Sequence, residues 1–323
     1  MINNFYVLKK GTLSVKSKSI IFKSKDLETI SIPIKQITDL YLFIDINPTS
    51  NVLKLILNHG IIIHYFNFYD YYLGSIIPKN HTNSGKLLIK EVNLYKNKSK
   101  RLNIAKKIVI AGFKNINRVV NYYSRRKDFS NDLKVEKYIN QINKANNINH
   151  IMIIEANYRK KYYDHISLIT NTNIFNRIQK DPKDIVNILI NFINSLLYSL
   201  IFSEIKKTNI SGKIGYLHEV ANNRYPLIYD ISEIFKPIIV DRLIFKLINR
   251  KQITKESLNE NYRLKNESIK LIFKEWNKSI TQTFYYKPLK RYISYRRLLR
   301  EELYKLERYL NKNVPYKPYI SRW

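Results

Sequence analysis

The chain of 323 residues contains no cysteine and only 7 glycines. Without cysteine there is neither a disulfide framework nor a thiolate metal site, which fits a reducing cytoplasm. No spaced pair of histidines indicates a zinc finger, and no Gly-rich phosphate loop indicates a nucleotide-hydrolysing motor. The sequence also has no internal repeat of fixed period. Chemistry in this chain therefore has to use oxygen and imidazole groups, without an external energy source.

Acidic residues are scarce as well, since 25 Asp and Glu stand against 57 Lys and Arg. The formal net charge of +32 produces a field that attracts polyanions, so nucleic acid is the first partner to consider. An alternative without functional meaning is that an A+T-rich coding sequence raises the numbers of Lys, Asn, Ile and Tyr residues. That alternative explains part of the excess, but the acidic residues are depleted too.

Long apolar runs and targeting segments are also missing. Residues 1–5 lack the basic-then-apolar form of a signal peptide. The longest apolar stretch, residues 188–202, is interrupted by Asn191 and Asn194 and is shorter than the roughly 20 residues that cross a bilayer. Because 45% of the residues are hydrophobic, wholesale disorder is excluded. We expect a soluble, cytoplasmic protein.

The first part of the chain has the pattern of β-strands. Short segments rich in β-branched and aromatic residues alternate with turn formers, at residues 5–8, 13–15, 19–22, 30–32, 40–44 and 61–66. One helix is expected from a cap at Thr49 through Leu57, ending before Gly60. These features predict a small β-rich domain over residues 1–84.

A polar segment at residues 78–85, with a proline and a glycine, is the predicted linker. After it the apolar residues take helical spacing over residues 86–121, and further helical patterns follow almost to the end. The fold class is therefore predicted to be α+β, with an N-terminal β-rich domain at 1–84 and a larger all-helical domain at 85–323.

Three dense local patterns surround Glu155, His218 and Glu233. Two carboxylates and an imidazole suit Mg²⁺ or Mn²⁺ and leave coordination positions open for a phosphate and a nucleophile. Basic residues beside them, Arg159, Lys160, Lys161 and Arg224, are candidates for contacts with DNA phosphates. The combination predicts metal-assisted chemistry on nucleic acid.

Each of these residues also has a structural interpretation. Glu155 is spaced to pair with Arg159 at i+4 on a helix, and a single histidine such as His218 is more often hydrogen-bonded than metal-bound. Asp230 and Glu233 form a capping-box pattern, in which Asp230 caps a helix and Glu233 reaches back to it. The four basic residues are equally typical of a solvated helix face. Basic runs at 125–127 and 296–308 are further candidates for a DNA track.

The order and the amino-acid sequences of these segments resemble those of the CRISPR-associated endonuclease family that acts as the integrase of spacer acquisition. The resemblance rests on E-x-N-x-R-K from position 155, G-Y-L-H-E from position 215 and D-x-x-E-x-F-K-P from position 230. It extends along nearly the whole chain, from the stretch at 32–34 to the one at 294–301.

The resemblance implies a catalytic metal bound by Glu155, His218 and Glu233, with Asp230 as an auxiliary carboxylate. It further implies that the β-rich domain dimerises the chain and that the helical domain holds the active site. The homodimer would join a small CRISPR adaptation partner protein and insert short DNA spacers into a CRISPR array by transesterification. The alternative is a non-catalytic nucleic-acid-binding module that keeps the same fold.

Overall fold

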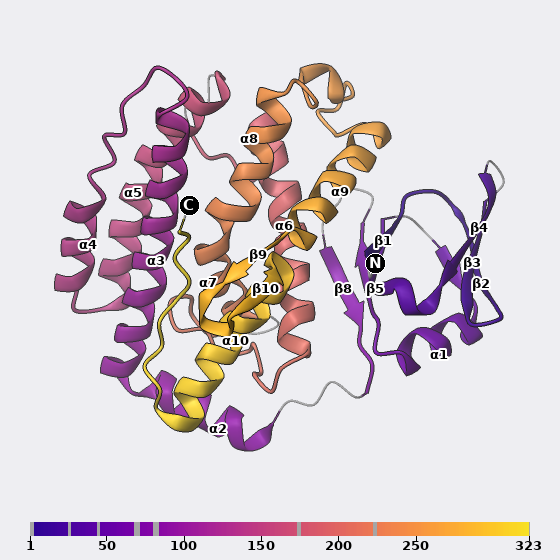
Figure 1. Cartoon of the computed structure of the whole chain (residues 1–323), viewed down its shortest axis with the longest axis horizontal. Helices are drawn as coiled ribbons and strands as arrows, with labels where there is room; N and C mark the ends of the chain where they lie inside the picture. Colours follow the sequence, from indigo (N-terminus) through magenta and orange to yellow (C-terminus); the bar gives the residue numbers. More distant parts are fainter. Residues whose placement is uncertain are drawn as a thin grey trace. The chain divides into compact units, whose positions relative to one another are not determined.

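The chain has an α+β architecture, as the sequence predicts, with strands in its first part and mainly helices beyond them (Figure 1). The computed structural model describes residues 3–24, 27–43, 46–67, 72–79, 84–172, 176–221 and 225–322. Two compact units are present. The strand-rich unit comprises Met1–Thr82 and Asn266–Asn277, and the helical unit comprises Asn83–Lys265 and Lys278–Trp323.

The strand-rich unit contains two four-stranded sheets. The first has the order β1 (Asn3–Val7), β5 (Ile37–Leu42), β7 (Ile62–Phe66) and β8 (Tyr72–Ile76). Its first three strands pair in parallel, and β8 is antiparallel to β7. The second sheet has the order β4 (Leu27–Pro33), β3 (Ser19–Ser24), β2 (Gly11–Lys16) and β6 (Ile46–Pro48), with only the β2–β6 pair parallel. A short turn, η1 (Ile34–Gln36), connects β4 to β5.

All six strands predicted from the sequence are present, although Ile44 lies outside the described residues. The sequence did not predict β6, a three-residue strand that ends in proline, or β8, which contains Gly74. Helix α1 (Ser50–Asn58) begins as expected, because the Thr49 hydroxyl accepts a hydrogen bond from the amide of Val52. Beyond its end, Gly60 adopts a φ of 71° that favours glycine.

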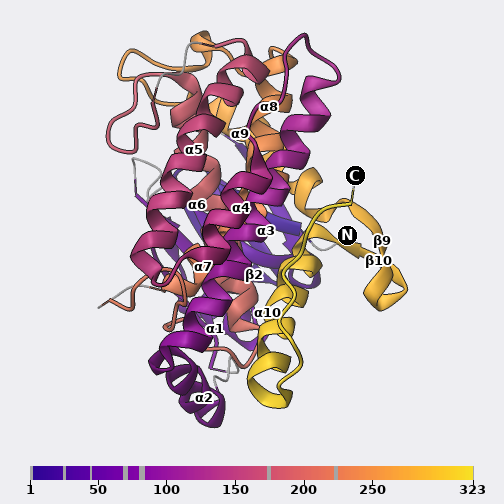
Figure 2. The same cartoon turned by 90° about the vertical axis from the view of Figure 1, so that its left-hand side faces the viewer.

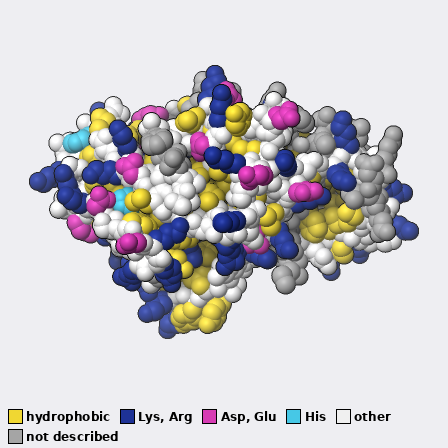
Figure 3. All heavy atoms as spheres, turned by 90° about the horizontal axis from the view of Figure 1, so that it is seen from above, with side chains coloured by type: hydrophobic (Ala, Val, Ile, Leu, Met, Phe, Trp, Pro, Cys, Tyr) yellow, Lys and Arg dark blue, Asp and Glu magenta, His cyan; other side chains and the backbone are white. Residues whose placement is uncertain are grey.

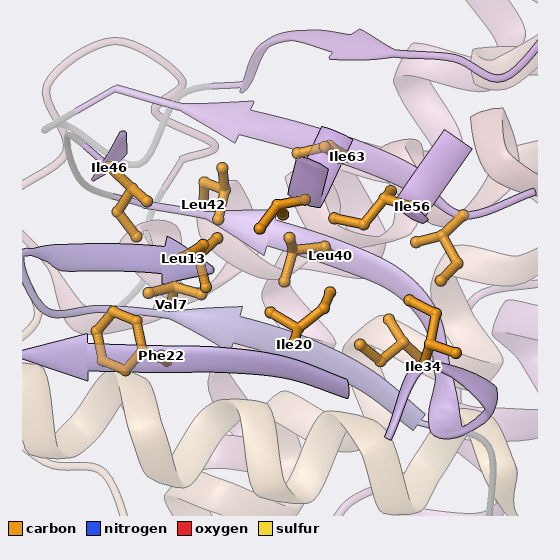
Figure 4. Packing of buried hydrophobic residues seen from close by; sticks show 13 residues of the cluster. Val7, Leu13, Ile20, Phe22, Ile34, Leu40, Leu42, Ile46, Ile56 and Ile63 are labelled. Atoms are coloured by element: carbon orange, nitrogen blue, oxygen red, sulfur yellow. The ribbon is translucent and has the colours of Figure 1, made fainter. Parts of the chain in front are cut away.

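The core of the strand-rich unit is a cluster of thirteen buried apolar residues. Leu13, Ile20 and Leu40 are each 2% exposed or less. In Figure 4 these side chains point toward one another from both sheets, with Ile56 of α1 joining them. Because each buried aliphatic side chain contributes about 1.5–3 kcal/mol relative to exposure, this cluster stabilises the unit.

A segment from late in the chain belongs to the strand-rich unit. Residues Asn266–Asn277 form most of helix α9 (Asn266–Thr281). The ring of Phe273 stacks on Tyr6 with centroids 3.9 Å apart, and the Tyr6 hydroxyl donates to Asn277 Oδ1 at 3.0 Å. The domain division predicted from the sequence, residues 1–84 and 85–323, placed Asn266–Asn277 in the helical domain instead. The return of this segment to the strands is caused by the aromatic pairing, which joins residues more than 260 positions apart.

The helical unit is built from long helices whose apolar faces meet. They are α2 (Gly85–Lys96), α3 (Lys98–Ser124), α4 (Val135–Lys144), α5 (Ile148–Thr170), α6 (Ile185–Lys206), α7 (Pro226–Phe235), η2 (Lys236–Asp241), α8 (Arg242–Asn249) and α10 (Tyr295–Lys312). Short turns η3 (Lys255–Ser257) and η4 (Lys287–Leu289) and a hairpin of β9 (Thr283–Tyr286) and β10 (Arg291–Ser294) complete it. The prediction of an all-helical domain is therefore wrong in this respect, because the unit is mostly helical and includes a short antiparallel hairpin. Helices α3, α4 and α5 lie side by side (Figure 2).

The structure shows where the predicted linker ends and divides the first predicted helix into two. Residues 80–83 of the predicted linker lie outside the described residues, and Ser84 caps α2. The helical pattern over 86–121 is divided between α2 and α3. Asn97 ends the first helix and caps the second, since its side chain accepts from the amide of Lys100.

Helix α6 is the core helix of the helical unit. It spans 22 residues, longer than the apolar stretch seen in the sequence, and its length and composition are those of a candidate membrane span. However, 78% of its most apolar window is buried inside the protein, where α6 packs against α7, η2 and α10. Those contacts explain its apolar character.

Candidate functional site

Helices α5 and α7 bring Glu155 and Glu233 to the same cation. Arg159, one turn after Glu155 on α5, donates from Nε to Oε1 of Glu155 and forms an ion pair through Nη2 with Oε2 of Glu233. The Lys236 ammonium contacts the other oxygen of Glu233 at 2.8 Å. The side chain of Glu233 is only 8% exposed. Two of the three predicted ligands are therefore neighbours around one guanidinium, and the i,i+4 pair considered for Glu155 is present.

Arg159 stays charged in this position. Burial acts to lower the pKa of its guanidinium, but the charge of Glu155, together with Tyr163 and the hydrogen bond to Glu155, outweighs burial and raises that pKa. Within the protein, Arg159 thus neutralises carboxylates instead of standing exposed for a phosphate. The DNA contact predicted for Arg159 stays a prediction.

His218 lies in a loop whose backbone amides donate hydrogen bonds to the Asp230 carboxylate. Both Asp230 oxygens accept from backbone amides, Oδ2 from Tyr216 at 2.5 Å and Leu217 at 3.1 Å, and Oδ1 from His218 at 3.0 Å. Oδ1 also lies 2.8 Å from Nδ1 of the His218 ring. The imidazole is thereby oriented through Nδ1, and Nε2 is the nitrogen left for another partner.

The capping role considered for Asp230 is wrong. Helix α7 begins at Pro226 with Tyr225 as its N-cap, so Asp230 lies inside the helix, one turn before Glu233. Asp230 is fully buried, and its hydrogen bonds go to the loop of His218 rather than to the helix start. One helix turn therefore places a loop-holding carboxylate beside Glu233.

A second contact fixes the same loop and was not predicted from the sequence. Arg101 of α3 donates from Nε to the carbonyl of Tyr216 at 3.0 Å and from Nη2 to Glu219 at 2.8 Å. Tyr95 of α2 donates to the other oxygen of Glu219 at 2.8 Å. The only sequence signal was the acidic residue next to His218, whose partners lie more than 110 positions away.

Two glycines allow the backbone of the site to pack closely. A Cβ on Gly215 would stand 2.7 Å from the carbonyl oxygen of His218 and 2.6 Å from Pro226. A Cβ on Gly112 of α3 would stand 3.0 Å from the carbonyl oxygen of Glu233. Gly215 is therefore required for the turn before His218, and Gly112 lets α7 approach α3.

Helix α7 continues into η2, a π-helical segment with Pro237 near its start. Proline cannot donate the backbone hydrogen bond of a regular α-helix, and single π-turns of this kind recur at functional sites. At the end of η2, Asp241 accepts from the Tyr162 hydroxyl at 2.7 Å. Burial raises the pKa of Asp241 to about 6, against the lowering effects of that hydrogen bond and of Arg159. Sequence reasoning missed Asp241.

The remaining basic candidates divide into two groups. Lys160 and Lys161 are exposed on α5, whereas Arg224 lies outside the described residues. In the C-terminal run, the other predicted DNA track, Arg296 and Arg300 donate to buried Glu204 at 2.7 and 2.6 Å. Burial alone would raise the pKa of Glu204, but these arginines and Lys207 lower it.

Arg297 and Lys305 are paired with Glu301 and Glu302 in the same helix. The predicted DNA track along this run is therefore mainly a set of internal ion pairs. Elsewhere, Lys and Arg side chains are spread over the visible face in Figure 3 and do not gather in one stripe.

The donor chemistry fits a divalent cation. Carboxylate oxygens and an imidazole whose Nδ1 bonds a carboxylate are the groups that hold Mg²⁺ or Mn²⁺ in proteins. Among the described residues, however, no three His, Asp or Glu groups lie close enough together to enclose an ion. The cation at Glu155 and Glu233 is instead Arg159. A divalent ion at Glu155 and Glu233 would therefore compete with Arg159 for the carboxylate oxygens.

In this α+β fold, Glu155 and Glu233 meet at Arg159, and His218 is held by Asp230. Residues 5–278 match the family model described as CRISPR associated protein Cas1. A CRISPR-associated endonuclease Cas1 from Fusobacterium nucleatum is 37% identical over an alignment of 333 positions, which covers 100% of this chain and 98% of that protein. The chain therefore belongs to the Cas1 family of CRISPR-associated endonucleases.

Solved structures agree with this assignment. A CAS1 protein from Thermotoga maritima superposes with a TM-score of 0.86 at 31% identity, covering 100% of both chains. A casposase bound to an integration product has a TM-score of 0.85 at 19% identity, covering 98% of this chain and 92% of that one. A Cas6-RT-Cas1–Cas2 complex has a TM-score of 0.82 at 16% identity, covering 100% of this chain and 36% of that one. The last two share the fold.

Proposed function

We propose that this chain is a divalent-metal-dependent DNA endonuclease and integrase, which inserts short DNA spacers into a CRISPR array by transesterification. The observation that carries the proposal is the convergence of Glu155 and Glu233 on one cationic group, with His218 oriented by Asp230 nearby in the sequence. Carboxylates held this way are costly to bury unless a cation accompanies them. The family assignment supports the nuclease activity.

The roles of the residues follow from their contacts. Glu155, Glu233 and Nε2 of His218 would hold Mg²⁺ or Mn²⁺, which when bound supplies charge neutralisation at the phosphate and activation of the attacking oxygen. Asp230 keeps the proton of His218 on Nδ1, so that Nε2 presents its lone pair. Lys236 and Arg159 hold the carboxylates in place, and exposed Lys160 and Lys161 face the DNA phosphates. We assign Arg224 to the same DNA contact from its sequence position.

The proposed partners are DNA, a second copy of the chain and a small CRISPR adaptation protein. The casposase structure contains an integration product, and one related fold comes from a complex that includes Cas2. We propose that the β-rich domain dimerises this chain in the cytoplasm, because full-site integration needs two active sites at a fixed spacing.

Strand transfer by the purified protein tests the proposal. We expect integration of a short duplex with Mg²⁺ or Mn²⁺ and none in EDTA. Glu155→Ala, His218→Ala and Glu233→Ala should each lower the rate at least about 100-fold, while DNA affinity changes little because distributed phosphate contacts supply it. The matched control is Glu136→Ala, an exposed carboxylate on α4. Wild-type rates in any one of the three variants would remove that residue from the site.

One observation favours a second candidate function, a non-catalytic nucleic-acid-binding module. Arg159 already satisfies both carboxylates, as in a purely structural ion-pair network. In that case EDTA, Mg²⁺ and the three substitutions would leave DNA binding unchanged, and no preparation would transfer a strand.

A further inference from the structure

Asn115 of α3 is fully buried and bonds to two parts of the chain that lie far from it in the sequence. Its Nδ2 donates to the carbonyl oxygen of Ile234 at 2.9 Å and to that of Tyr319 at 3.1 Å. Its Oδ1 accepts from the amide of Ser321 at 2.8 Å. One side chain therefore joins α3 both to α7 and to the segment that follows α10.

The bond to Ile234 falls one residue after Glu233, where α7 is about to pass into the π-helical η2. In a regular α-helix the carbonyl of Glu233 would accept from the amide four residues later, but Pro237 occupies that position and has no N–H. The helix therefore lacks one of its regular hydrogen bonds at Glu233. Asn115 supplies a donor to the next carbonyl from the neighbouring helix.

Gly112 lies one turn before Asn115 on the same face of α3. A Cβ at Gly112 would stand 3.0 Å from the carbonyl oxygen of Glu233. The backbone of Glu233 is thus in close contact with α3, and the following carbonyl is hydrogen-bonded to the same helix. Together the two positions fix the distance between α7 and α3.

The C-terminal segment, residues 313–322, contacts the same part of α7. After α10 the chain returns beside α3, where Ser321 meets Asn115 (Figures 1 and 2). The ring of Tyr319 stacks on that of Phe235 with centroids 6.1 Å apart and planes at 3°. The amide of Tyr319 donates to the buried Glu302 of α10 at 3.1 Å. The segment therefore holds α7 directly through Phe235 and indirectly through Asn115.

We propose that Asn115 is a positioning residue that, together with the C-terminal segment, sets the place of the Glu233 carboxylate. This carboxylate extends from the stretch of backbone that Asn115 holds, and it meets Glu155 of α5 at Arg159. Because α5 also packs on α3, a shift of α7 along or away from α3 would change the separation of the two carboxylates. Outer contacts of this kind tune how well ligands hold a metal ion. The part of the proposal that concerns metal rests on the function proposed above.

Mn²⁺ binding to the full chain, measured by calorimetry, tests the positioning role. Asn115→Leu keeps the branched shape of the side chain and removes its hydrogen bonds. The matched control is Asn187→Leu in α6. Asn187 is 1% exposed, its Nδ2 donates to Asn176 and Asp184, and its Oδ1 accepts from the amide of Ile178, so its partners in the described part of the chain lie outside α7.

A purely structural role and a positioning role predict different results for these two variants. Both substitutions remove hydrogen bonds from a buried asparagine, so both should lower the midpoint of urea denaturation. Only Asn115→Leu should weaken Mn²⁺ binding, by about 10–100-fold. Wild-type Mn²⁺ affinity in Asn115→Leu, or equal weakening in Asn187→Leu, would overturn the positioning role.

Gly112→Ala separates position from stability, and it carries the same test if Asn115→Leu does not fold. Alanine is the better helix former, but its Cβ would press on the carbonyl of Glu233. We expect a smaller loss of urea midpoint than in Asn187→Leu and Mn²⁺ binding weaker by about tenfold. Unchanged Mn²⁺ affinity in Gly112→Ala would contradict the proposal.

Hydrogen exchange of residues 226–241 in EDTA gives a measurement that needs no metal. These residues should exchange faster in Asn115→Leu than in the wild type or in Asn187→Leu, because α7 loses its bond to α3. Equal exchange in all three proteins would show that Asn115 does not hold α7. If the wild type binds no Mn²⁺, the metal-dependent function fails, and the exchange of residues 226–241 still decides the role of Asn115.

Discussion

The apolar cluster of the strand-rich unit and the buried carboxylates of the helical unit are stabilised in different ways. The cluster is entirely apolar, and the buried Asp39, His64 and Glu275 of that unit lie outside it. The helical unit buries several carboxylates, each 6% exposed or less: Glu91, Glu204, Asp230, Glu233 and Glu302. An apolar cluster needs volume and shape, whereas each buried carboxylate needs a named partner. We therefore expect the first unit to tolerate conservative changes that the second does not.

The largest effect on stability is expected at Asp230. Asp230→Ala leaves the amides of Tyr216, Leu217 and His218 without their acceptor, so the free energy of unfolding should fall by about 3–5 kcal/mol. Urea denaturation of the full chain measures this. Asp230→Asn should cost more stability than Glu233→Gln, but Glu233→Gln should cost more integration activity. The reverse order of activities would exchange the roles of the two carboxylates.

A comparable but more forgiving effect is expected in the strand-rich cluster. Leu13→Ala removes a side chain that is 1% exposed and should cost about 2–5 kcal/mol. Leu13→Met conserves volume and should cost less than about 1.5 kcal/mol. The same urea experiment measures both variants. If the methionine variant were as damaging as Asp230→Asn, the contrast between the two units would not hold.

Local patterns explain which parts of the fold were predictable. Six strands and α1 were predicted because alternation, and a cap such as Thr49, operate within a few residues. The return of Asn266–Asn277 to the strands was not, because it depends on Tyr6 meeting Phe273. Periodicity within a segment carries no information about such a distant partner.

The candidate site shows the same limit. The motifs around Glu155, His218 and Glu233 are recognisable in the sequence, but their connections are not. The Arg159 pair with Glu155 follows helix spacing, whereas its pair with Glu233 joins α5 to α7. Likewise Arg101 and Asp230 hold the His218 loop from two different helices. Local motifs predicted the candidate site, and tertiary packing decided which cation each carboxylate meets.

A smaller, pH-dependent effect is expected at Glu91, a carboxyl of α2 that accepts from the amide of Ser211 at 3.1 Å. Burial raises its pKa from 4.5 to about 7, although that hydrogen bond acts to lower it. Between these values the folded chain keeps a proton that the unfolded chain has lost. Stability is therefore lost as the pH rises from 4.5 to 7, by about 3 kcal/mol at most.

Glu91→Gln should remove this dependence, because an amide keeps an acceptor for Ser211 without ionising. Relative to the wild type, the variant should gain about 1–3 kcal/mol between pH 5 and pH 8, measured by urea denaturation at several pH values. Glu136→Gln, an exposed carboxylate of α4, is the control and should show no such trend. A stability difference that stays constant with pH would mean that Glu91 ionises normally in the folded chain.

The smallest expected effect is on metal affinity, and it concerns Arg159, the cation that Glu155 and Glu233 share. The apolar cluster of the strand-rich unit contains no such ion pair. Arg159 bridges Glu155 and Glu233, so a divalent ion held there would compete with it for the carboxylate oxygens. Arg159→Gln removes the competing charge and leaves Lys236 as the cation at Glu233. A tenfold gain in Mn²⁺ affinity corresponds to about 1.4 kcal/mol of added stabilisation, or about 3–6 °C in the melting temperature of a unit of this size. We therefore expect Mn²⁺ to raise the melting temperature more in Arg159→Gln than in Lys160→Gln, which loses the same charge from an exposed neighbouring position. An equal increase in melting temperature in the two variants would mean that Arg159 does not compete with the metal. A smaller increase in Arg159→Gln would mean that the Arg159 guanidinium helps to hold the ligands for the ion.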